Sequence, residues 1–307
     1  MKELITRPQL LKDFVGKTNI KLSLDTYIQS AKMRKQNLDH IIFYGSPGVG
    51  KTSLATIIAN ELNTNIHYVQ GPSINKISDV IDMVSLIKEN DVIFIDEIHQ
   101  VNVKCLEIFY SILEDFVADI KIGKDFNSQY TRLQLPKFTL IASTTNFGKL
   151  PTPFIDRFGI KLFIDLYNES EIFQIIERIC KLNNLNINEQ NKKRIASYSK
   201  GTPRIAINLT NRFYDYQLIN ENMSADDIFN AIGIYKYGLN KVDINYLKIL
   251  TTNYKPIGIR SIAQQLYLDS LTIEFTIEPY LLILGFICKN NLGRQITDKG
   301  RNYLKNL

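Results

Sequence analysis

Apolar and polar residues follow two recurring patterns along roughly the first 165 residues of the chain. Short apolar runs have the length of buried strands, which are apolar on both faces in a parallel sheet. They lie near residues 40–45, 65–69, 91–96, 137–143 and 160–164. Apolar positions at helical spacing fall between them, near residues 20–35, 52–62, 77–88 and 101–114. This alternation predicts an α/β fold, with a parallel sheet that carries helices on both faces.

The rest of the chain changes pattern twice. From residue 169 to about 237 the apolar positions keep helical spacing throughout, which predicts a small all-helical domain. The sequence predicts a linker at residues 237–240. The remainder predicts three short helices and then a glycine-broken hairpin around residues 290–294, the outline of a winged helix. We therefore expect three domains, at residues 1–167, 168–238 and 239–307.

The run from Gly45 to Thr52 matches the pattern G-x-x-x-x-G-K-[ST] and lies between a predicted strand and a predicted helix. In such a loop, glycines let successive backbone N–H groups turn toward phosphates and the lysine ammonium neutralises them. The hydroxyl of Thr52 would ligate Mg²⁺. The sequence therefore predicts a site for a nucleoside triphosphate, with Lys51 at the phosphates.

Asp96 and Glu97 end an apolar run, so the strand should carry both carboxylates to the carboxyl edge of the sheet, beside the phosphate loop. We expect Asp96 to hold the hydration shell of Mg²⁺ and Glu97 to orient and polarise the attacking water. Alone, such a pair could merely cap a strand. Its position 45 residues after Lys51 favours the catalytic role.

Three further positions suit phosphate chemistry. The apolar strand at residues 138–142 is followed by polar residues, among which Thr145 is our first choice as a γ-phosphate sensor and Asn146 the alternative. Arg157 follows a proline-rigidified turn and could serve as an arginine finger that acts in trans. A surface pair with Asp156 is the other interpretation. Arg204 begins a helix after Gly-Thr-Pro, where the helix N-terminus favours a bound phosphate, although an ordinary capped helix start would look the same.

The composition bounds the class of protein. The 307 residues are 45% apolar and 22% charged, which is ordinary for a globular protein with two or three cores. No apolar run approaches the roughly 20 residues that span a bilayer, and the N-terminus lacks an apolar signal core, so we expect a cytoplasmic protein without a membrane segment. Three cysteines and three histidines form no cluster, which indicates neither a disulfide framework nor a metal other than Mg²⁺.

The net charge of +6 is concentrated near the C-terminus. Residues 241–307 hold nine basic residues against five acidic ones. Lys289 and Arg294 lie on the predicted wing and could track DNA phosphates without reading bases. A winged helix that contacts proteins is the alternative.

Together, the phosphate loop, the Asp-Glu strand, the sensor strand, the Asp-Arg-Phe turn and the Gly-Thr-Pro-Arg turn resemble the AAA+ ATPases. The likeness is closer to one branch, the RuvB family of motors for Holliday-junction branch migration. The runs that carry it include Leu11–Lys17, Phe94–His99, Leu113–Phe116, Asp156–Ile160, Gly201–Ala206 and Glu278–Leu281. The resemblance extends from about residue 4 to the C-terminus, and includes a last domain that other AAA+ families do not share.

The resemblance implies a homohexameric ring that uses ATP to pull duplex DNA at a Holliday junction, with RuvA as junction-binding partner and RuvC as resolvase. The three domains would be a large AAA+ ATPase domain, a small helical lid and a winged-helix head. A hairpin at about 119–135 would dock on RuvA, with Ile120, Ile122, Phe126 and Tyr130 as candidate apolar contacts. Arg157 would act on the ATP of the neighbouring subunit. The nucleotide contacts that the resemblance implies are Thr6, Arg7, Gly48, Gly50, Lys51, Thr52, Ser53, Glu114, Asp115, Phe116, Arg157, Tyr167 and Arg204.

The chain departs from the family pattern at several positions. Ser46 interrupts a usual pair of prolines, and Gln100, Ile155 and Lys289 stand where arginine is frequent. Lys289 can neutralise a phosphate but cannot form a bidentate fork. Two other functions stay open. A clamp-loader-like AAA+ subunit is disfavoured by the Glu-Pro-Tyr-Leu run of the head, and a non-hydrolysing, nucleotide-gated DNA-binding regulator is disfavoured by Glu97 and Arg157.

Overall fold

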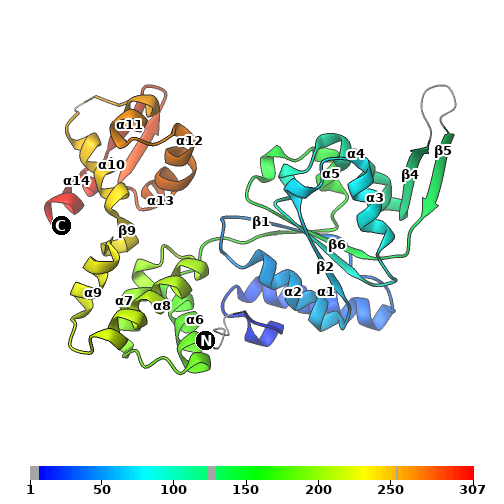
Figure 1. Cartoon of the computed structure of the whole chain (residues 1–307), viewed down its shortest axis with the longest axis horizontal. Helices are drawn as coiled ribbons and strands as arrows, with labels where there is room; N and C mark the ends of the chain where they lie inside the picture. The colour runs from blue at the N-terminus through cyan, green and yellow to red at the C-terminus, as the bar shows by residue number, and fades with distance from the viewer. Residues whose placement is uncertain (1–6, 123–128, 254) are drawn as a thin grey trace. The chain divides into compact units, whose positions relative to one another are not determined.

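The apolar runs of the first half of the chain form five strands that pair in parallel (Figure 1). Their order across the sheet is β2-β3-β6-β1-β7. The strands are β1 (Ile41–Tyr44), β2 (Ile66–Gln70), β3 (Val92–Asp96), β6 (Thr139–Thr144) and β7 (Ile160–Phe163). The α/β fold with a parallel sheet is thereby confirmed.

This computed structural model describes residues 7–122, 129–253 and 255–307. The chain divides into two compact units. Unit 1 consists of Met1–Asn183 with Thr202–Arg204, and unit 2 consists of Asn184–Gly201 with Ile205–Leu307. The short Thr202–Arg204 segment therefore belongs to the unit that holds the sheet, although the helix it begins continues in unit 2.

Helices connect the strands of unit 1 near the predicted positions. They are α1 (Thr18–Arg34), α2 (Lys51–Leu62), α3 (Ile77–Ser85), α4 (Val103–Asp115), α5 (Thr152–Asp156) and α6 (Glu169–Asn183). Short 3-10 turns add η1 (Leu11–Asp13), η2 (Gly71–Ser73), η3 (Ile98–Gln100) and η5 (Phe147–Lys149). The proline-rich turn before Arg157 proves to be α5, a helix of five residues.

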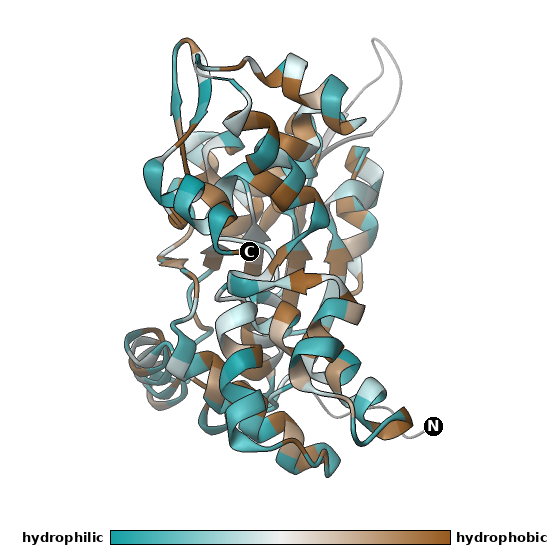
Figure 2. Cartoon of the chain, turned by 90° about the vertical axis from the view of Figure 1, so that its left-hand side faces the viewer, coloured by the Kyte–Doolittle hydropathy of each residue, from teal (hydrophilic) through white to brown (hydrophobic). Residues whose placement is uncertain are grey.

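The core of unit 1 lies between the sheet and its helices. Ile93 and Leu140 of neighbouring strands pack in one buried cluster with Phe109 of α4 and with Phe154 and Phe158. In Figure 2 the strands of the sheet are largely brown, whereas the helices carry both brown and teal residues. Burial on both faces explains why the inner strands β1, β3 and β6 read as largely apolar runs and not as alternating ones.

An antiparallel hairpin precedes β6 at the position expected for the RuvA-docking element. It consists of β4 (Val117–Ile122) and β5 (Gln129–Gln134), paired from Val117 opposite Gln134 to Ile122 opposite Gln129. Figure 1 shows it projecting from the sheet and helices of unit 1. Arg132 and Asp119 form an exposed ion pair across the two strands. Phe126 lies outside the described residues. For Ile120, Ile122 and Tyr130, the other candidate apolar contacts, the structure describes the backbone and not the side chain.

The described residues of unit 2 are helical except for two short strand pairs and turns. Its first part contains α7 (Glu189–Tyr198), α8 (Pro203–Ile219), α9 (Ala225–Ile232), β8 (Ile234–Tyr235), η6 (Lys236–Gly238) and β9 (Leu239–Asn240). Its second part contains α10 (Lys241–Thr251), α11 (Ile259–Leu266), α12 (Ser270–Thr272), the π-helical η7 (Ile273–Ile277), α13 (Glu278–Ile283), β10 (Ile287–Asn290), β11 (Gly293–Ile296) and α14 (Asp298–Lys305). The helices α10 to α13, followed by the β10–β11 hairpin, form the predicted winged helix. The hydrophobic pattern did not predict the final helix, α14.

The head has a core of its own. Tyr246, Leu247, Ile262, Leu281 and Phe286 are buried together. Within unit 2, polar contacts connect this core to the preceding segments: the Lys200 ammonium donates to Asp243 at 2.8 Å, and the Tyr303 hydroxyl donates to the carbonyl of Lys236 at 3.0 Å. Among the described residues, no helix combines the length and the apolar character that a bilayer crossing requires.

His40 joins three parts of unit 1 just before β1. The residue is 7% exposed, and its Nδ1 accepts a hydrogen bond from the Leu140 N–H at 2.9 Å. Nε2 must then carry the hydrogen that reaches the Leu113 carbonyl at 3.1 Å. Burial lowers the pKa of His40 from 6.5 to about 4, against the opposing effects of the Leu113 hydrogen bond and the Asp39 charge. The ring is therefore neutral at pH 7.

This neutral ring predicts an acid-sensitive fold. Because the folded-state pKa lies below the unfolded value, His40 contributes stability that is present above pH 6.5 and is lost as the pH falls toward 4. When the pH is lowered from 7 to 5, protonation of this group in the unfolded state should reduce the free energy of unfolding by about 2 kcal/mol. We expect His40→Asn, which cannot titrate, to remove about this much of the pH dependence. Urea unfolding followed by circular dichroism at the two pH values measures it, and an unchanged pH dependence in the variant would contradict the assignment.

Candidate active site

The phosphate loop lies at the carboxyl edge of the sheet, between β1 and α2. Lys51 is the first residue of α2, and Gly50 before it has φ 105°. The Lys51 ammonium donates to the carbonyls of Gly45 at 2.8 Å and Ser46 at 2.9 Å. Thr52 and Ser53 follow in the first turn of α2, as the motif requires. The loop is thus folded around the lysine that is expected to contact phosphate.

Charged residues of other elements surround Lys51. The residue is 6% exposed, and burial lowers its pKa, while the charges of Glu97 and Asp96 oppose the shift and that of Arg204 adds to it. Two segments distant in the sequence, residues 96–97 and Arg204, therefore influence one ammonium. The structure brings Lys51, Asp96, Glu97 and Arg204 to one place, as the sequence predicted.

The two carboxylates at the end of β3 have different partners. Asp96 Oδ1 accepts from the Ser143 hydroxyl and, at 3.2 Å, from the Glu97 N–H. No described residue donates a hydrogen bond to its Oδ2, so this oxygen can accept from the water shell of a cation. Oxygen ligands such as Asp96 and Thr52 are those that Mg²⁺ prefers, so the donor set fits the metal of a bound nucleotide. Among the described residues, no group of three or more His, Cys, Asp or Glu side chains could hold a metal on its own.

Glu97 is joined to the end of the sensor strand. Its Oε2 accepts from the Thr145 N–H at 3.0 Å and from the Thr145 hydroxyl at 2.9 Å. Asn146 instead directs its amide toward the His99 ring, with 3.5 Å between Nδ2 and Nε2. Of the two sensor candidates, Thr145 is therefore the one in direct contact with the expected catalytic carboxylate.

The backbone of Glu97 depends on a glycine that the sequence analysis did not single out. Glu97 has φ 51°, an unusual conformation for a residue with a side chain. A Cβ on Gly71 would lie 2.3 Å from the Glu97 carbonyl oxygen, so the close approach requires glycine. Gln70, the preceding residue, is in register with Asp96. Gln70 and Gly71 belong to no recognisable motif, so only the pairing of β2 with β3 could have revealed the contact between Gly71 and Glu97.

The Gly-Thr-Pro-Arg turn packs directly on the phosphate loop. The Arg204 N–H donates to the Gly48 carbonyl at 3.3 Å. Gly48 has φ 80°, and a Cβ there would lie 2.9 Å from Arg204 Cβ and 3.0 Å from Thr202 Cγ2. Arg204 is thus held beside the loop by a contact that only glycine permits.

Tyr167 also lies at the loop, as the resemblance implied. Its hydroxyl donates to the Val49 carbonyl at 3.1 Å, and burial raises its pKa, so the hydroxyl keeps its proton. Lys17, which the sequence analysis did not propose, places its ammonium 4.4 Å from the Tyr167 ring centroid and donates to the Leu166 carbonyl at 2.8 Å. Lys17 therefore fixes the segment that carries Tyr167.

The N-terminal segment lies along α2. The Leu11 N–H donates to Glu61 at 3.1 Å, and Asn60 donates to the Gln9 carbonyl at 2.9 Å. Arg7 is exposed, and its carbonyl accepts from Gln9. Thr6 lies outside the described residues. The expected contacts of Thr6 and Arg7 with the base remain predictions.

Arg157 lies at the opposite edge of the sheet. It precedes β7, whose first residue Ile160 is in register with Ile41 at the start of β1. The phosphate loop follows the other end of β1, and four residues of strand separate the edges by about 13 Å. Glu114 lies at the same amino edge, where its carboxylate is 2.8 Å from the Arg157 guanidinium. The structure therefore separates the predicted nucleotide contacts into two groups.

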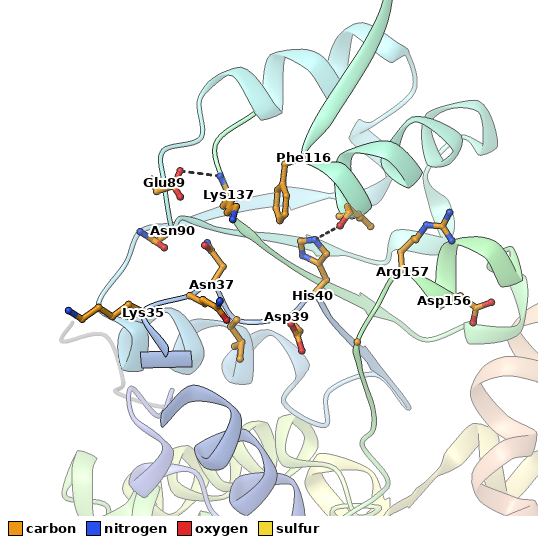
Figure 3. A pocket seen from close by; sticks show the side chains of 14 residues that line it. Lys35, Asn37, Asp39, His40, Glu89, Asn90, Phe116, Lys137, Asp156 and Arg157 are labelled. Carbon is orange, nitrogen blue, oxygen red and sulfur yellow. Dashed lines mark hydrogen bonds between the residues drawn. The ribbon is translucent and has the colours of Figure 1, made fainter. Parts of the chain in front are cut away.

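A pocket of about 670 Å³ opens at this amino edge (Figure 3). Phe116, His40 and Arg157 are among the residues that line it. The Arg157 guanidinium lies 5.8 Å from the Tyr110 ring centroid, and its buried Nε has no hydrogen-bond partner among the described residues. Ion pairing and ring contact hold the side chain at this edge, with one donor still available.

In the head, the structure corrects one expectation about DNA binding. Arg294 is 8% exposed, and its guanidinium donates to both oxygens of Glu278, at 2.7 and 3.2 Å. Glu278 is itself buried and also accepts from Tyr246 at 3.0 Å. The Arg294 charge is therefore neutralised inside the head and is not available to a phosphate in this structure. Lys289 is 40% exposed at its side chain and pairs with Glu274 at 2.6 Å, so it keeps access to solvent.

Comparisons with known protein families agree with this arrangement over nearly the whole chain. Residues 6–164 match the Holliday junction DNA helicase RuvB P-loop domain, residues 167–241 the RuvB AAA lid domain, and residues 236–305 the RuvB C-terminal winged helix domain. The chain belongs to the RuvB family.

Full-length RuvB proteins are similar to this chain. One, from Ureaplasma urealyticum and named Holliday junction branch migration complex subunit RuvB, is 48% identical, with 98% of this chain and 96% of the relative covered. A relative of the same name from Mycoplasma genitalium is 42% identical over the full length of both. A solved structure described as the Thermotoga maritima RuvB Holliday junction branch migration motor is 36% identical, covers 98% of each chain and has a TM-score of 0.84. RuvB membership and the predicted fold are confirmed.

The contact between Gly48 and the Gly-Thr-Pro-Arg turn predicts a binding defect that can be measured. In Gly48→Ala, a left-handed backbone adds about 1–2 kcal/mol of strain, and the methyl group pushes Arg204 and Thr202 away from the loop. We expect affinity for a fluorescent ATP analogue to fall about tenfold or more, measured by anisotropy. Gly258→Ala is the matched control, because a Cβ there meets nothing within 4 Å and φ is −69°. Equal affinities for wild type and Gly48→Ala would show that the contact does not shape the loop.

Proposed function

We propose that this chain hydrolyses ATP to drive Holliday-junction branch migration, as one subunit of a homohexameric ring around duplex DNA. The observation that supports this most strongly is the separation of the nucleotide residues between the two edges of one sheet. A chain that carries a complete phosphate loop at one edge and an arginine at the other can complete its site only by contact with another copy. The relatives from Ureaplasma and Mycoplasma are named as branch migration complex subunits, which supports the choice of substrate.

The residues at the carboxyl edge would bind and hydrolyse the nucleotide. Lys51 and the backbone N–H groups of the loop would neutralise the phosphates, while Thr52 and Asp96 would hold Mg²⁺. The metal would neutralise charge that develops between the β- and γ-phosphates. Glu97 would polarise the attacking water, since its Oε1 has no partner among the described residues while its Oε2 is bound by Thr145. Arg204 and Tyr167 would report the state of the nucleotide through their contacts with the loop.

The residues at the amino edge would serve the neighbouring subunit. In this proposal Arg157 leaves or shares its ion pair with Glu114 and donates to the γ-phosphate of the next subunit, where it stabilises charge in the transition state. Asp115 and Phe116 at the end of α4 would border the same nucleotide. Ile155, which stands beside the finger where arginine is frequent, offers no second cation.

DNA would be held by the head, and partners by the large domain. Exposed basic side chains of residues 239–307 suit non-specific contacts with DNA phosphates. They are Lys241, Lys248, Lys255, Arg260, Lys289, Lys299 and Lys305. The β4–β5 hairpin would dock on RuvA, and RuvC would join the junction complex. We propose the domain bounds 1–167, 168–238 and 239–307 for these parts, and the cytoplasm as the place where the motor meets its DNA.

Branch migration on a synthetic four-way junction, with and without RuvA, tests this function. We expect the wild-type protein to convert the junction only when ATP is supplied. Glu97→Gln is the matched control because it keeps the shape and the metal site but loses the charge that polarises water. We expect it to bind the ATP analogue within about threefold of wild type, while hydrolysis falls by a factor on the order of 10² or more and no junction moves.

The branch-migration assay, combined with a measurement of ATP hydrolysis, separates the alternative functions. ATP hydrolysis that never moves a junction under either condition would favour a clamp-loader-like subunit. Absence of hydrolysis with and without duplex DNA would leave the nucleotide-gated regulator. Near-normal turnover in Glu97→Gln would refute the role assigned to Glu97.

A further inference from the structure

His99 is a buried side chain at the active site for which the proposed mechanism has not yet given a role. Its side chain is 6% exposed, and Nδ1 lies 3.1 Å from Glu97 Oε2 and 3.0 Å from the Thr144 hydroxyl. The other ring nitrogen, Nε2, lies 3.5 Å from the Asn146 amide. The ring thus stands between the expected catalytic carboxylate and the last residues of the sensor strand.

The contacts determine where the ring carries its hydrogen. A carboxylate oxygen offers only lone pairs, so a bare lone pair on Nδ1 would be repelled by Oε2 at 3.1 Å, which places the hydrogen on Nδ1. Thr144 Oγ1 also accepts, from the Asn146 N–H at 3.0 Å, which is consistent with the same tautomer. Burial lowers the pKa of His99, although the charge of Glu97 opposes the shift, so the ring is neutral at pH 7 and Nε2 bears a lone pair. That lone pair faces the Asn146 amide, a donor.

All the donors that reach the Glu97 carboxylate converge on one oxygen. The Thr145 N–H and the Thr145 hydroxyl donate to Oε2. His99 Nδ1 lies 3.1 Å from the same oxygen, while its hydrogen bond is with the Thr144 hydroxyl. Among the described residues, Oε1 has no partner. A carboxylate fixed through one oxygen presents the other in a defined direction, and hydrogen bonds to a charged acceptor are the strong kind. The arrangement therefore orients Oε1, the oxygen left for water.

We propose that His99 is a positioning residue for ATP hydrolysis, one that fixes the Glu97 carboxylate through Oε2 and couples it to the sensor strand through Thr144 and Asn146. The proposal rests on the assigned role of Glu97 in hydrolysis. His99 touches neither water nor phosphate in this account. Its loss lets the carboxylate rotate about its remaining anchor, Thr145, so fewer bound waters are polarised correctly.

Substitutions that replace one ring nitrogen at a time test the proposal. Asparagine can place its amide Nδ2 near the position of Nδ1, whereas glutamine reaches the position of Nε2. For His99→Ala we expect kcat to fall about 10- to 100-fold with KM for ATP within about threefold, because misplacement of a catalytic group lowers the rate and not the binding. His99→Asn should recover to within about fivefold of wild type, and His99→Gln should stay near His99→Ala. His67→Ala, at a histidine bonded to Asp91 on β2, is the control and should keep wild-type hydrolysis.

A double variant separates positioning from general damage. If His99 acts through Glu97, adding His99→Ala to Glu97→Gln should slow the residual hydrolysis no further. A further loss equal to that of His99→Ala alone would overturn the proposal. So would equal rates for the asparagine and glutamine variants, a comparison that holds even if the alanine variant does not fold. Retained turnover in Glu97→Gln alone would instead refute the proposed function, so the two failures are distinguishable.

Discussion

The structure depends on one constraint, the parallel direction of the strands that carry the nucleotide residues. Every strand of the sheet runs from the edge of Arg157 to the edge of the phosphate loop. The two edges are about 13 Å apart across β1, so the chain cannot bring its arginine to its own γ-phosphate without breaking the sheet. In the proposed function, this geometry would require a site completed between subunits. Under that proposal, ring assembly would be a condition for hydrolysis, which would suit a motor whose subunits act in a coordinated way around DNA.

At the loop edge, distant segments hold one another in place. Gly48 admits the Gly-Thr-Pro-Arg turn, Tyr167 is bonded to the loop at Val49, and Gly71 admits the left-handed backbone of Glu97. Each contact either needs a glycine or satisfies a polar group of the loop. Movement of the loop would therefore displace Arg204, the second residue of α8, whose later residues belong to unit 2. The same close contacts make the carboxylate geometry sensitive to single substitutions.

Local motifs allowed much of the fold and of the candidate site to be predicted from the sequence. The features that were not predicted depend on long-range contacts. The strands, the phosphate loop and the Asp-Glu pair were predictable because their signals lie within a few adjacent residues. The contact of Thr145 with Glu97 and the closeness of Gly71 to its carbonyl depend on strand register, which no motif records. Arg294 was wrongly expected to be free for DNA because its partner Glu278 lies on a helix 16 residues earlier. The roles of the site residues in catalysis stay predictions, although the structure brings most of them together.

Mixed rings offer the most direct test of a site shared between subunits. Arg157→Ala keeps an intact phosphate loop and lacks the finger, whereas Lys51→Ala keeps the finger and lacks a functional loop. Each protein alone should hydrolyse little ATP. When the two are mixed, the Arg157 of a Lys51→Ala subunit can serve the loop of an Arg157→Ala neighbour, so hydrolysis should rise above the sum of the separate proteins. Mixed rings verified by mass that show no such gain would contradict the account.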